Sequence, residues 1–92
     1  MHVRILDEAR ADLRNISNYI KSENPAAAQR VITAILTTIS QLENFPFLGR
    51  NGREEGTREI SVPRVPYFVI YTLPDEYHID IEAVFHETMA IM

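Results

Sequence analysis

Apolar residues in the first half of the chain recur at the spacing of a helix. Between residues 9 and 20 they stand four, three and four positions apart, on one helical face: Ala9, Leu13, Ile16 and Ile20. Asp7 is placed to cap this helix, with Glu8 at the positive end of its dipole. Residues 2–6, which precede it, alternate as a short strand. The pattern predicts a strand followed by a helix that ends near Lys21.

A second helical pattern begins directly after the first. Asn24 is a favoured N-cap and Pro25 suits the first helical position, so the helix is expected to run to about Glu43. Its apolar face is broad and consists of Val31, Ile32, Ile35, Leu36, Ile39 and Leu42. A face this wide packs against both the first helix and a sheet. The short connection predicts an antiparallel helical hairpin.

In the second half, the pattern changes to the period of two that strands show. Residues 50–56 are polar and contain glycine, so we expect an exposed loop. Residues 57–62 alternate, and residues 67–73 are apolar on both faces, as in a central strand covered on both sides. After a turn at residues 73–76, residues 78–86 alternate again.

Strict alternation assigns a face to each side chain of the two outer strands. In the first, Arg58, Ile60 and Val62 oppose Thr57, Glu59 and Ser61. In the last, Ile79, Ile81, Ala83 and Phe85 oppose His78, Asp80, Glu82, Val84 and His86. Short turns between three strands favour an antiparallel meander. The chain is therefore predicted to be one α+β domain, residues 1–92, with β-α-α-β-β-β order and both helices on one face of the sheet.

Composition narrows the protein class. Of the 92 residues, 46% are hydrophobic and 24% are charged, which is typical of a folded globular domain rather than a disordered chain. The absence of cysteine excludes disulfides, thiolate metal sites and a cysteine nucleophile. No apolar run near the N-terminus is long enough for a signal peptide or a membrane span, so we expect a cytoplasmic protein with no membrane partner.

The charge balance bears on nucleic-acid binding. Acidic residues outnumber basic ones by 13 to 9, giving a net charge of −4. Proteins that grip a nucleic-acid backbone usually carry a basic surplus, so we expect no direct specific DNA binding by the chain alone. All the basic residues except Lys21 are arginines, which suit bidentate contacts with carboxylate or phosphate.

Four arginines form the first candidate site: Arg50, Arg53, Arg58 and Arg64. They flank the polar loop and the strand after it, where guanidinium groups near a sheet edge could bind a phosphate or an acidic partner segment. The alternative is a solvated loop in which Glu54, Glu55 and Glu59 neutralise three of them, a common surface pattern.

The second candidate combines Tyr67, Tyr71 and His86. The two tyrosines are four positions apart on one strand and so share a face. Such a face could stack bases or relay protons. The alternative is a pair of half-buried core tyrosines with solvated hydroxyls.

The third candidate is the group of His78, His86, Asp80 and Glu82 on the last strand. Metal ligands must converge, but residues along one strand face stand about 6–7 Å apart per pair. We therefore expect no metal site. The sequence also lacks a nucleophile elbow and a phosphate-binding glycine loop, so no cofactor is expected.

Several short motifs, taken in order, resemble the ParE branch of the ParE/RelE toxin superfamily of type II toxin–antitoxin systems. They span Ala9 to His86 and comprise Ala11-Asp12-Leu13 with Ile16, Tyr19 and Ile20; Asn24-Pro25-Ala26-Ala27-Ala28-Gln29-Arg30; Leu42 with Phe45-Pro46-Phe47-Leu48-Gly49-Arg50; Gly56-Thr57-Arg58-Glu59; Pro63 with Pro66-Tyr67; Tyr71; and Val84 with His86. The resemblance implies the RelE/ParE-like fold and a cognate antitoxin partner, ParD-like or RelB-like.

The superfamily divides by mechanism, and the residues near the chain's end bear on the division. RelE-like members are ribosome-dependent mRNA nucleases with several basic side chains in the site, whereas ParE-like members poison DNA gyrase. Here Pro63 and Glu87 stand where the nuclease branch tends to place arginines, and no Arg, Lys or Tyr follows His86. The gyrase branch commonly ends in a His-x-x-Arg-x-Trp type of sequence, from which Thr88-Met89-Ala90-Ile91-Met92 departs. This apolar tail is expected to pack on the sheet or on a partner.

The resemblance thus implies a toxin that inhibits DNA gyrase and is neutralised by an antitoxin. The antitoxin would lay an acidic–apolar segment across the hairpin and the sheet, folding as it binds. The predicted partner- and target-binding residues are Arg50, Arg53, Arg58, Tyr67 and His86. One alternative is a RelE-like mRNA endonuclease using Arg58, Tyr67 and His86 as catalytic residues. The other is a non-toxic ParE-like interaction module.

Overall fold

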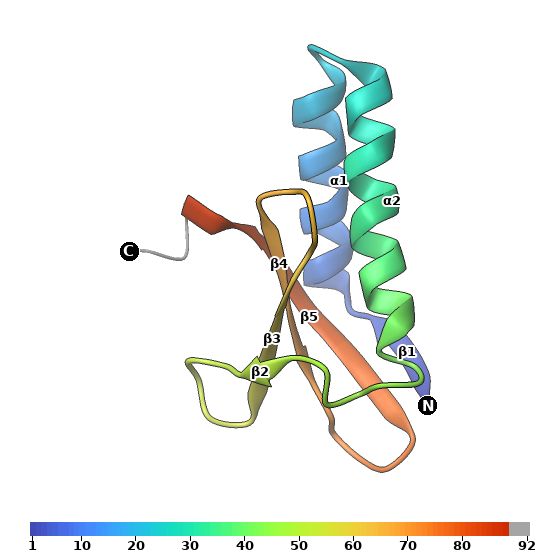
Figure 1. Ribbon diagram of the computed structural model, residues 1–92, viewed down its shortest axis with the longest axis vertical. Coiled ribbons are helices and arrows are strands. Elements are labelled where there is room, and N and C mark those ends of the chain that lie inside the picture. Colours follow the sequence, from blue (N-terminus) through green and yellow to red (C-terminus); the bar gives the residue numbers. More distant parts are fainter. Residues whose placement is uncertain (89–92) are drawn as a thin grey trace.

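A computed structural model describes residues 1–88 of the chain. Its elements are β1 (His2–Ile5), α1 (Asp7–Lys21), α2 (Pro25–Gln41), β2 (Arg50–Asn51), β3 (Thr57–Ser61), β4 (Tyr67–Thr72) and β5 (His78–His86). Both helices lie on one side of the sheet (Figure 1). The predicted α+β fold, with its helical hairpin and its meander, is confirmed.

The sheet has the strand order β1-β5-β4-β3-β2. Strands β3, β4 and β5 form the predicted antiparallel meander, and β1 joins the far side of β5 in parallel. Helix α1 packs on α2 and on β5, whereas α2 reaches β4. The outer halves of the two helices extend beyond the sheet (Figure 1). The sheet therefore covers only the lower part of the hairpin.

The helix starts differ in how their free N–H groups are satisfied. Asn24 caps α2 as predicted, because its side chain accepts a hydrogen bond from the Ala27 amide at 3.1 Å. The prediction that Asp7 caps α1 is wrong. Leu6 holds the cap position with no side-chain hydrogen bond, and Asp7 is the first helical residue. Its charge still lies at the positive end of the helix dipole.

One short strand was missed in the second half. Residues 50–56 were predicted to be entirely loop, but Arg50 and Asn51 pair with Glu59 and Arg58 as strand β2. Two residues are too few to show a period in their hydrophobicity, so no pattern could have indicated this strand.

The alternation predicted for β5 is wrong in its last part because the strand contains a β-bulge. Ile70 pairs with Ala83 and Tyr71 pairs with Ile81, which leaves Glu82 without a partner in the ladder. The extra residue reverses the faces beyond it. The Thr72 hydroxyl donates to the Glu82 carboxylate at 3.0 Å beside the bulge.

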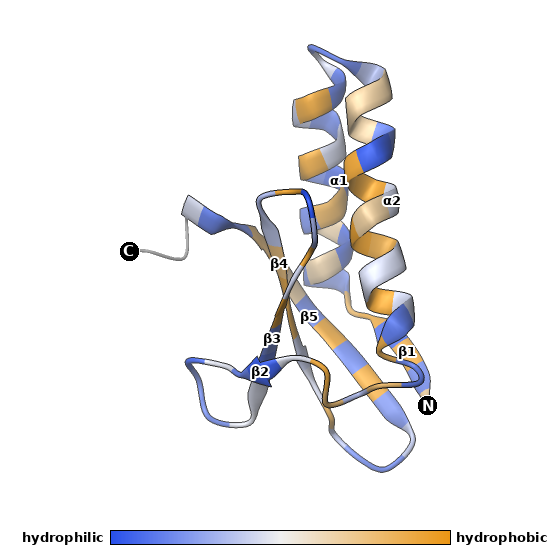
Figure 2. Ribbon diagram, in the orientation of Figure 1, coloured by the Kyte–Doolittle hydropathy of each residue, from blue (hydrophilic) through white to orange (hydrophobic). Residues whose placement is uncertain are grey.

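The main core lies between the helices and the sheet. Its largest fully buried side chains are Tyr71, Ile35, Leu42, Ile79, Ile81 and Val69. Figure 2 shows hydrophobic and hydrophilic residues alternating along β5, as a strand with one buried face requires. Beyond the bulge, Val84 faces this core while Ala83 and Phe85 face away from it.

The other face of the sheet is here called the open face, and within residues 1–88 no helix packs on it. Both faces of β4 are buried, as predicted, but only one is covered by helices. On the open face Phe68 is buried next to Phe85, with ring centroids 5.8 Å apart. Ile70 and Ala83 continue this apolar strip in the next register row. The open face is thus hydrophobic over the two central strands.

Candidate functional site

Tyr71 holds the loop between α2 and β2 from inside the protein. It is fully buried, and its hydroxyl donates to the Pro46 carbonyl oxygen at 2.8 Å and accepts from the Gly49 amide at 2.9 Å. A Cβ atom at Gly49 would lie 2.7 Å from both the Tyr71 hydroxyl and the Glu59 carbonyl oxygen. Glycine is therefore required for the loop to approach the sheet this closely.

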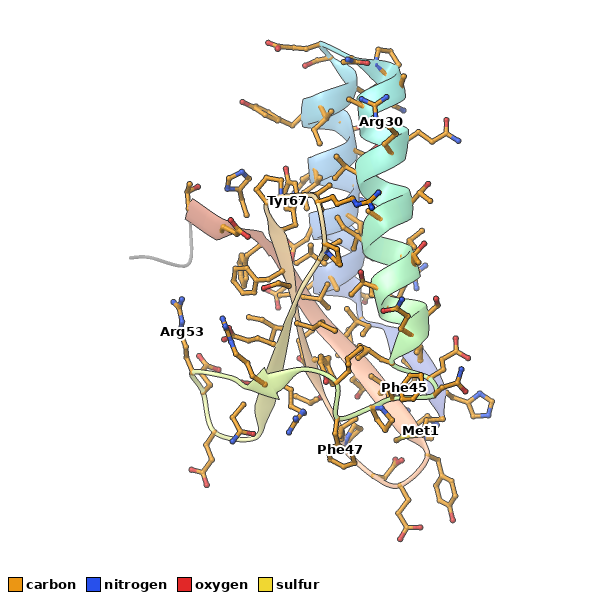
Figure 3. The ribbon with its side chains drawn as sticks, viewed as in Figure 1. Met1, Arg30, Phe45, Phe47, Arg53 and Tyr67 are labelled. Carbon is orange, nitrogen blue, oxygen red and sulfur yellow. The ribbon has the colours of Figure 1, made fainter. Side chains whose placement is uncertain are left out.

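Arg58 supports the same loop from its other side. Its guanidinium donates to the carbonyl oxygens of Phe47, at 3.1 Å, and of Gly49, and to the Asn51 side chain at 3.3 Å. The guanidinium carbon also lies 5.2 Å from the centre of the Phe47 ring. Phe47 itself is exposed, on the loop at the opposite end of the sheet from Tyr67 (Figure 3). Arg58 thus has structural contacts that occupy most of its donors.

Arg50 and Arg53 gather around a buried carboxylate on the open face. Glu59 is only 6% exposed; one of its oxygens lies 3.5 Å from Arg50 Nη2 and the other accepts from the Arg53 amide at 3.3 Å. The Arg50 side chain remains 74% exposed, and Arg53 extends from the β2–β3 loop away from the helices (Figure 3). Both guanidinium groups are accessible from solvent.

A groove of about 200 Å³ lies beside these arginines. It is lined by Arg53, Glu54, Thr57, Glu59, Phe68, Ile70 and Phe85. Its floor is the apolar strip of the open face, and its rim carries both signs of charge. Arg64 does not belong to this group, because it lies in the β3–β4 turn, with the left-handed φ of 73°. The predicted four-arginine cluster is therefore divided.

Tyr67 and His86 come together at the other end of the sheet. They pair across β4 and β5, and their rings meet edge to face with centroids 5.1 Å apart. The Thr88 amide donates to His86 Nδ1 at 3.2 Å, and the Thr88 hydroxyl lies 2.9 Å from the same nitrogen. The bulge at Glu82 makes this contact possible, because it turns His86 toward the helix side.

These two rings form part of a cleft between α1 and the end of the sheet. The cleft has a volume of about 520 Å³ and is lined by Asp12, Asn15, Ile16, Tyr19, Tyr67, Val84, Phe85, His86 and Thr88. Four of these residues belong to α1, namely Asp12, Asn15, Ile16 and Tyr19. Their spacing of three, one and three positions places them on one face of the helix. The Val84 amide donates to Asp12 Oδ2 at 3.0 Å and fixes this carboxylate against β5.

Burial changes the chemistry of Tyr67. The Tyr67 residue is 8% exposed, and its hydroxyl has no hydrogen-bond partner among residues 1–88. Desolvation raises the pKa of the Tyr67 phenol, and the nearby phenol of Tyr19 raises it further. At neutral pH Tyr67 is therefore a neutral donor or acceptor that opens into the cleft.

The predicted site residues fall into two groups. Arg58 pairs with Tyr71, four residues along β4 from Tyr67, which corresponds to a separation of about 13 Å. The three residues predicted as a catalytic group are thus not all brought together: Tyr67 and His86 adjoin, and Arg58 stands apart. The role of all five predicted contact residues stays a prediction.

The residue spacing did not indicate that Asp12, Asn15 and Tyr19 belong to a site. The signal was present, since Asp12 lies directly beside the apolar stripe of α1 at Leu13. The sequence does not show that the end of β5 packs against this helix, and without that contact Asp12 resembles any other polar residue of α1. The predicted role of the apolar tail concerns residues 89–92, which lie outside the described part of the chain.

Two further properties of the described residues concern metal binding and membrane-spanning helices. Within residues 1–88, no group of three or more His, Asp or Glu side chains could hold a metal ion. His78 instead contacts Asp75, whose pKa is lowered by the Tyr77 amide and by the His78 ring. No helix in the same part of the chain is long and apolar enough to cross a membrane.

The chain is similar to known proteins along nearly its whole length. A family model described as the ParE toxin of the type II toxin–antitoxin system parDE matches residues 3–91. The candidate toxin Y4kP of Sinorhizobium fredii is 36% identical over 67 residues, which are 73% of this chain and 70% of that protein.

Two solved structures share the fold. A chain of the chromosomal ParDE toxin–antitoxin system from P. aeruginosa superposes with a TM-score of 0.83 at 20% identity, covering 94% of this chain and 95% of that one. A chain of the RelBE2 toxin–antitoxin complex from Mycobacterium tuberculosis gives a TM-score of 0.67 at 27% identity, covering 92% and 95%. The RelE/ParE-like fold predicted from the sequence is confirmed.

Proposed function

Because the chain belongs to the ParE family of toxins of type II toxin–antitoxin systems, we propose that it inhibits DNA gyrase and is neutralised by a cognate antitoxin. The proposal places the chain in the cytoplasm, where gyrase acts. Family membership supports the role of the chain as a toxin. The side chains on the sheet support the choice of gyrase over RNA as its target.

The observation that carries this choice is the apolar open face. Cleavage of RNA through a 2′-hydroxyl needs a base and cationic groups that converge on one phosphate. Within residues 1–88, the centre of the open face offers Phe68, Ile70, Ala83 and Phe85 instead. Arginines stand only at its rim, and Arg50 is next to the buried carboxylate of Glu59.

The same face has the chemistry expected of an antitoxin-binding surface. An acidic–apolar segment, ParD-like or RelB-like, could place apolar side chains in the groove over Phe68 and carboxylates beside Arg50 and Arg53. The two solved neighbours support this partnership, since both come from toxin–antitoxin systems. Arg58, Tyr67 and His86 remain in the proposed contact set, with Arg58 acting mainly through the loop that it holds.

Supercoiling by purified gyrase tests the proposal. The folded chain at micromolar concentration should slow supercoiling and accumulate cleaved DNA complexes, and an excess of the antitoxin encoded beside it should reverse both effects. A heat-denatured sample of the same protein serves as the control. Normal supercoiling in the presence of protein with a native circular dichroism spectrum would contradict the gyrase target.

One observation favours a second candidate function, an mRNA endonuclease. Tyr67 and His86, two side chains of types that can transfer protons, lie next to each other with ring centroids 5.1 Å apart, although Arg58 is distant from them. Primer extension on translated mRNA after induction separates the two functions, because a ribosome-dependent nuclease leaves codon-phased ends. Normal growth on induction without antitoxin would instead favour the non-toxic interaction module.

A further inference from the structure

The cleft between α1 and the sheet contains a carboxylate but no cation. Ion pairs within residues 1–88 join Arg4 to Asp80, Arg50 to Glu59, and His78 to Asp75. Asp12 takes part in none of them, and no Arg or Lys is among the residues that line the cleft. The cleft is therefore a partly buried site of negative charge.

The Asp12 carboxylate has one oxygen available. Oδ2 accepts the Val84 amide at 3.0 Å, which fixes the group in place, whereas Oδ1 has no hydrogen-bond donor among the described residues. Asp12 is partly buried between α1 and β5. A carboxylate that has lost part of its hydration gains from a charged donor more than an exposed one does.

The walls around Asp12 are aromatic. Tyr67, Phe85 and His86 supply the sheet side, and Tyr19 on α1 supplies the outer side, 81% exposed. Aromatic faces attract cations, and a planar guanidinium stacks on them better than an ammonium does.

The cleft and the groove on the open face share the lining residue Phe85 on β5. A single segment that crosses Phe85 would therefore meet Arg53 on one side and Asp12 on the other. Such a segment needs an acidic residue toward the groove and a basic residue toward the cleft.

We propose that the cleft binds an arginine side chain of the cognate antitoxin, with the guanidinium paired to Asp12 and stacked against Tyr19. The inference rests on the proposed function only in naming the antitoxin. An arginine satisfies each feature of the cleft: the available oxygen, the aromatic walls and the missing cation. It also fixes the direction of the antitoxin segment across the toxin, because the two ends of the path carry opposite charges.

A blocked arginine tests the site directly. N-acetyl-arginine amide, titrated into the isotope-labelled toxin, should shift the NMR signals of the Val84 amide and of the Tyr19 and Tyr67 rings. N-acetyl-citrulline amide, which has nearly the same shape but no charge, should bind at least about tenfold more weakly because it cannot form the charged pair. Equal shifts with citrulline would overturn the assignment.

Two variants and a control assign the binding to named residues. Asp12→Asn keeps an acceptor for the Val84 amide and removes the charge, so arginine binding should fall by at least about tenfold while the melting temperature is maintained. Tyr19→Ala should weaken it by about two- to fivefold, because Tyr19 is exposed. Glu8→Gln, on the exposed first turn of α1, is the matched control and should bind arginine as the native chain does.

The antitoxin itself provides the second arm. Calorimetry with the antitoxin encoded beside the toxin should show about ten- to a hundredfold weaker binding by Asp12→Asn than by Glu8→Gln. Loss of gyrase inhibition with unchanged antitoxin affinity would overturn the assignment to the antitoxin. A toxin that leaves gyrase active but shows the predicted loss of antitoxin affinity would contradict the gyrase proposal and retain this one.

Discussion

Two tyrosines on one strand have opposite roles. Tyr67 and Tyr71 stand four residues apart on β4 and face the same side, yet the Tyr71 hydroxyl has two hydrogen bonds and that of Tyr67 has none within residues 1–88. The difference comes from the segments that return to each end of the strand. The loop at residues 46–49 closes over Tyr71, whereas α1 leaves a cleft beside Tyr67. Position on a strand sets the direction of a side chain, and distant segments set its role.

The largest expected effect comes from filling the space that Tyr71 needs. Gly49→Ala would place a Cβ atom 2.7 Å from the Tyr71 hydroxyl and from the Glu59 carbonyl oxygen. The clash and the two disrupted hydrogen bonds should together lower the free energy of unfolding by about 3 kcal/mol or more. Urea denaturation measures the loss. A change below about 1 kcal/mol would mean that the loop is not held by the Tyr71 hydroxyl.

Removing one oxygen atom from each tyrosine sharpens the comparison. Tyr71→Phe leaves the Gly49 amide and the Pro46 carbonyl oxygen without their partner and should cost about 2 kcal/mol. Tyr67→Phe is the matched variant and should change stability by less than about 0.5 kcal/mol, since no hydrogen bond within residues 1–88 is lost. Equal losses in the two variants, measured by thermal and urea unfolding, would remove the distinction.

The smallest effect concerns alkaline pH. The raised pKa of Tyr67 means that the folded protein retains this proton when the unfolded chain has released it. Stability from this group is therefore fully present below the ordinary tyrosine pKa, near about 10, and is lost as the pH rises through the higher folded value. Between these two pKa values the native protein should lose stability more steeply than Tyr67→Phe, as urea midpoints at a series of pH values would show. Parallel curves would mean that Tyr67 ionises as in the unfolded chain.

The general fold could be predicted because the hydrophobic patterns of its helices extend over many residues. The apolar stripes of the two helices extend over several turns, and Asn24-Pro25 marks the second helix start directly. The faces of β4 also followed from simple alternation. The parallel pairing of β1 with β5 was not predicted, because four residues at the N-terminus do not indicate which strand they will join.

The site was less predictable because it depends on contacts between distant segments. Arginine spacing alone could not show that Arg58 would turn inward to the loop carbonyls while Arg50 and Arg53 stayed exposed. Asp12 gains its importance from Val84, 72 residues later in the chain. Tyr67 and His86 were predicted among the contact residues, but the strict alternation assumed for β5 put His86 on the face opposite Ile81, and the bulge brings it to the helix side.

The unpaired residue at Glu82 also affects how this chain should be matched to its relatives. A relative that lacks that residue would keep its histidine on the helix side without a bulge, whereas a relative that pairs all of these residues regularly would present the histidine on the open face. Two sequences could thus share the same residue letters in β5 and present them to different partners. Whether an alignment places a gap at Glu82 therefore decides if the residues after it are assigned to the helix side or to the open face of the sheet.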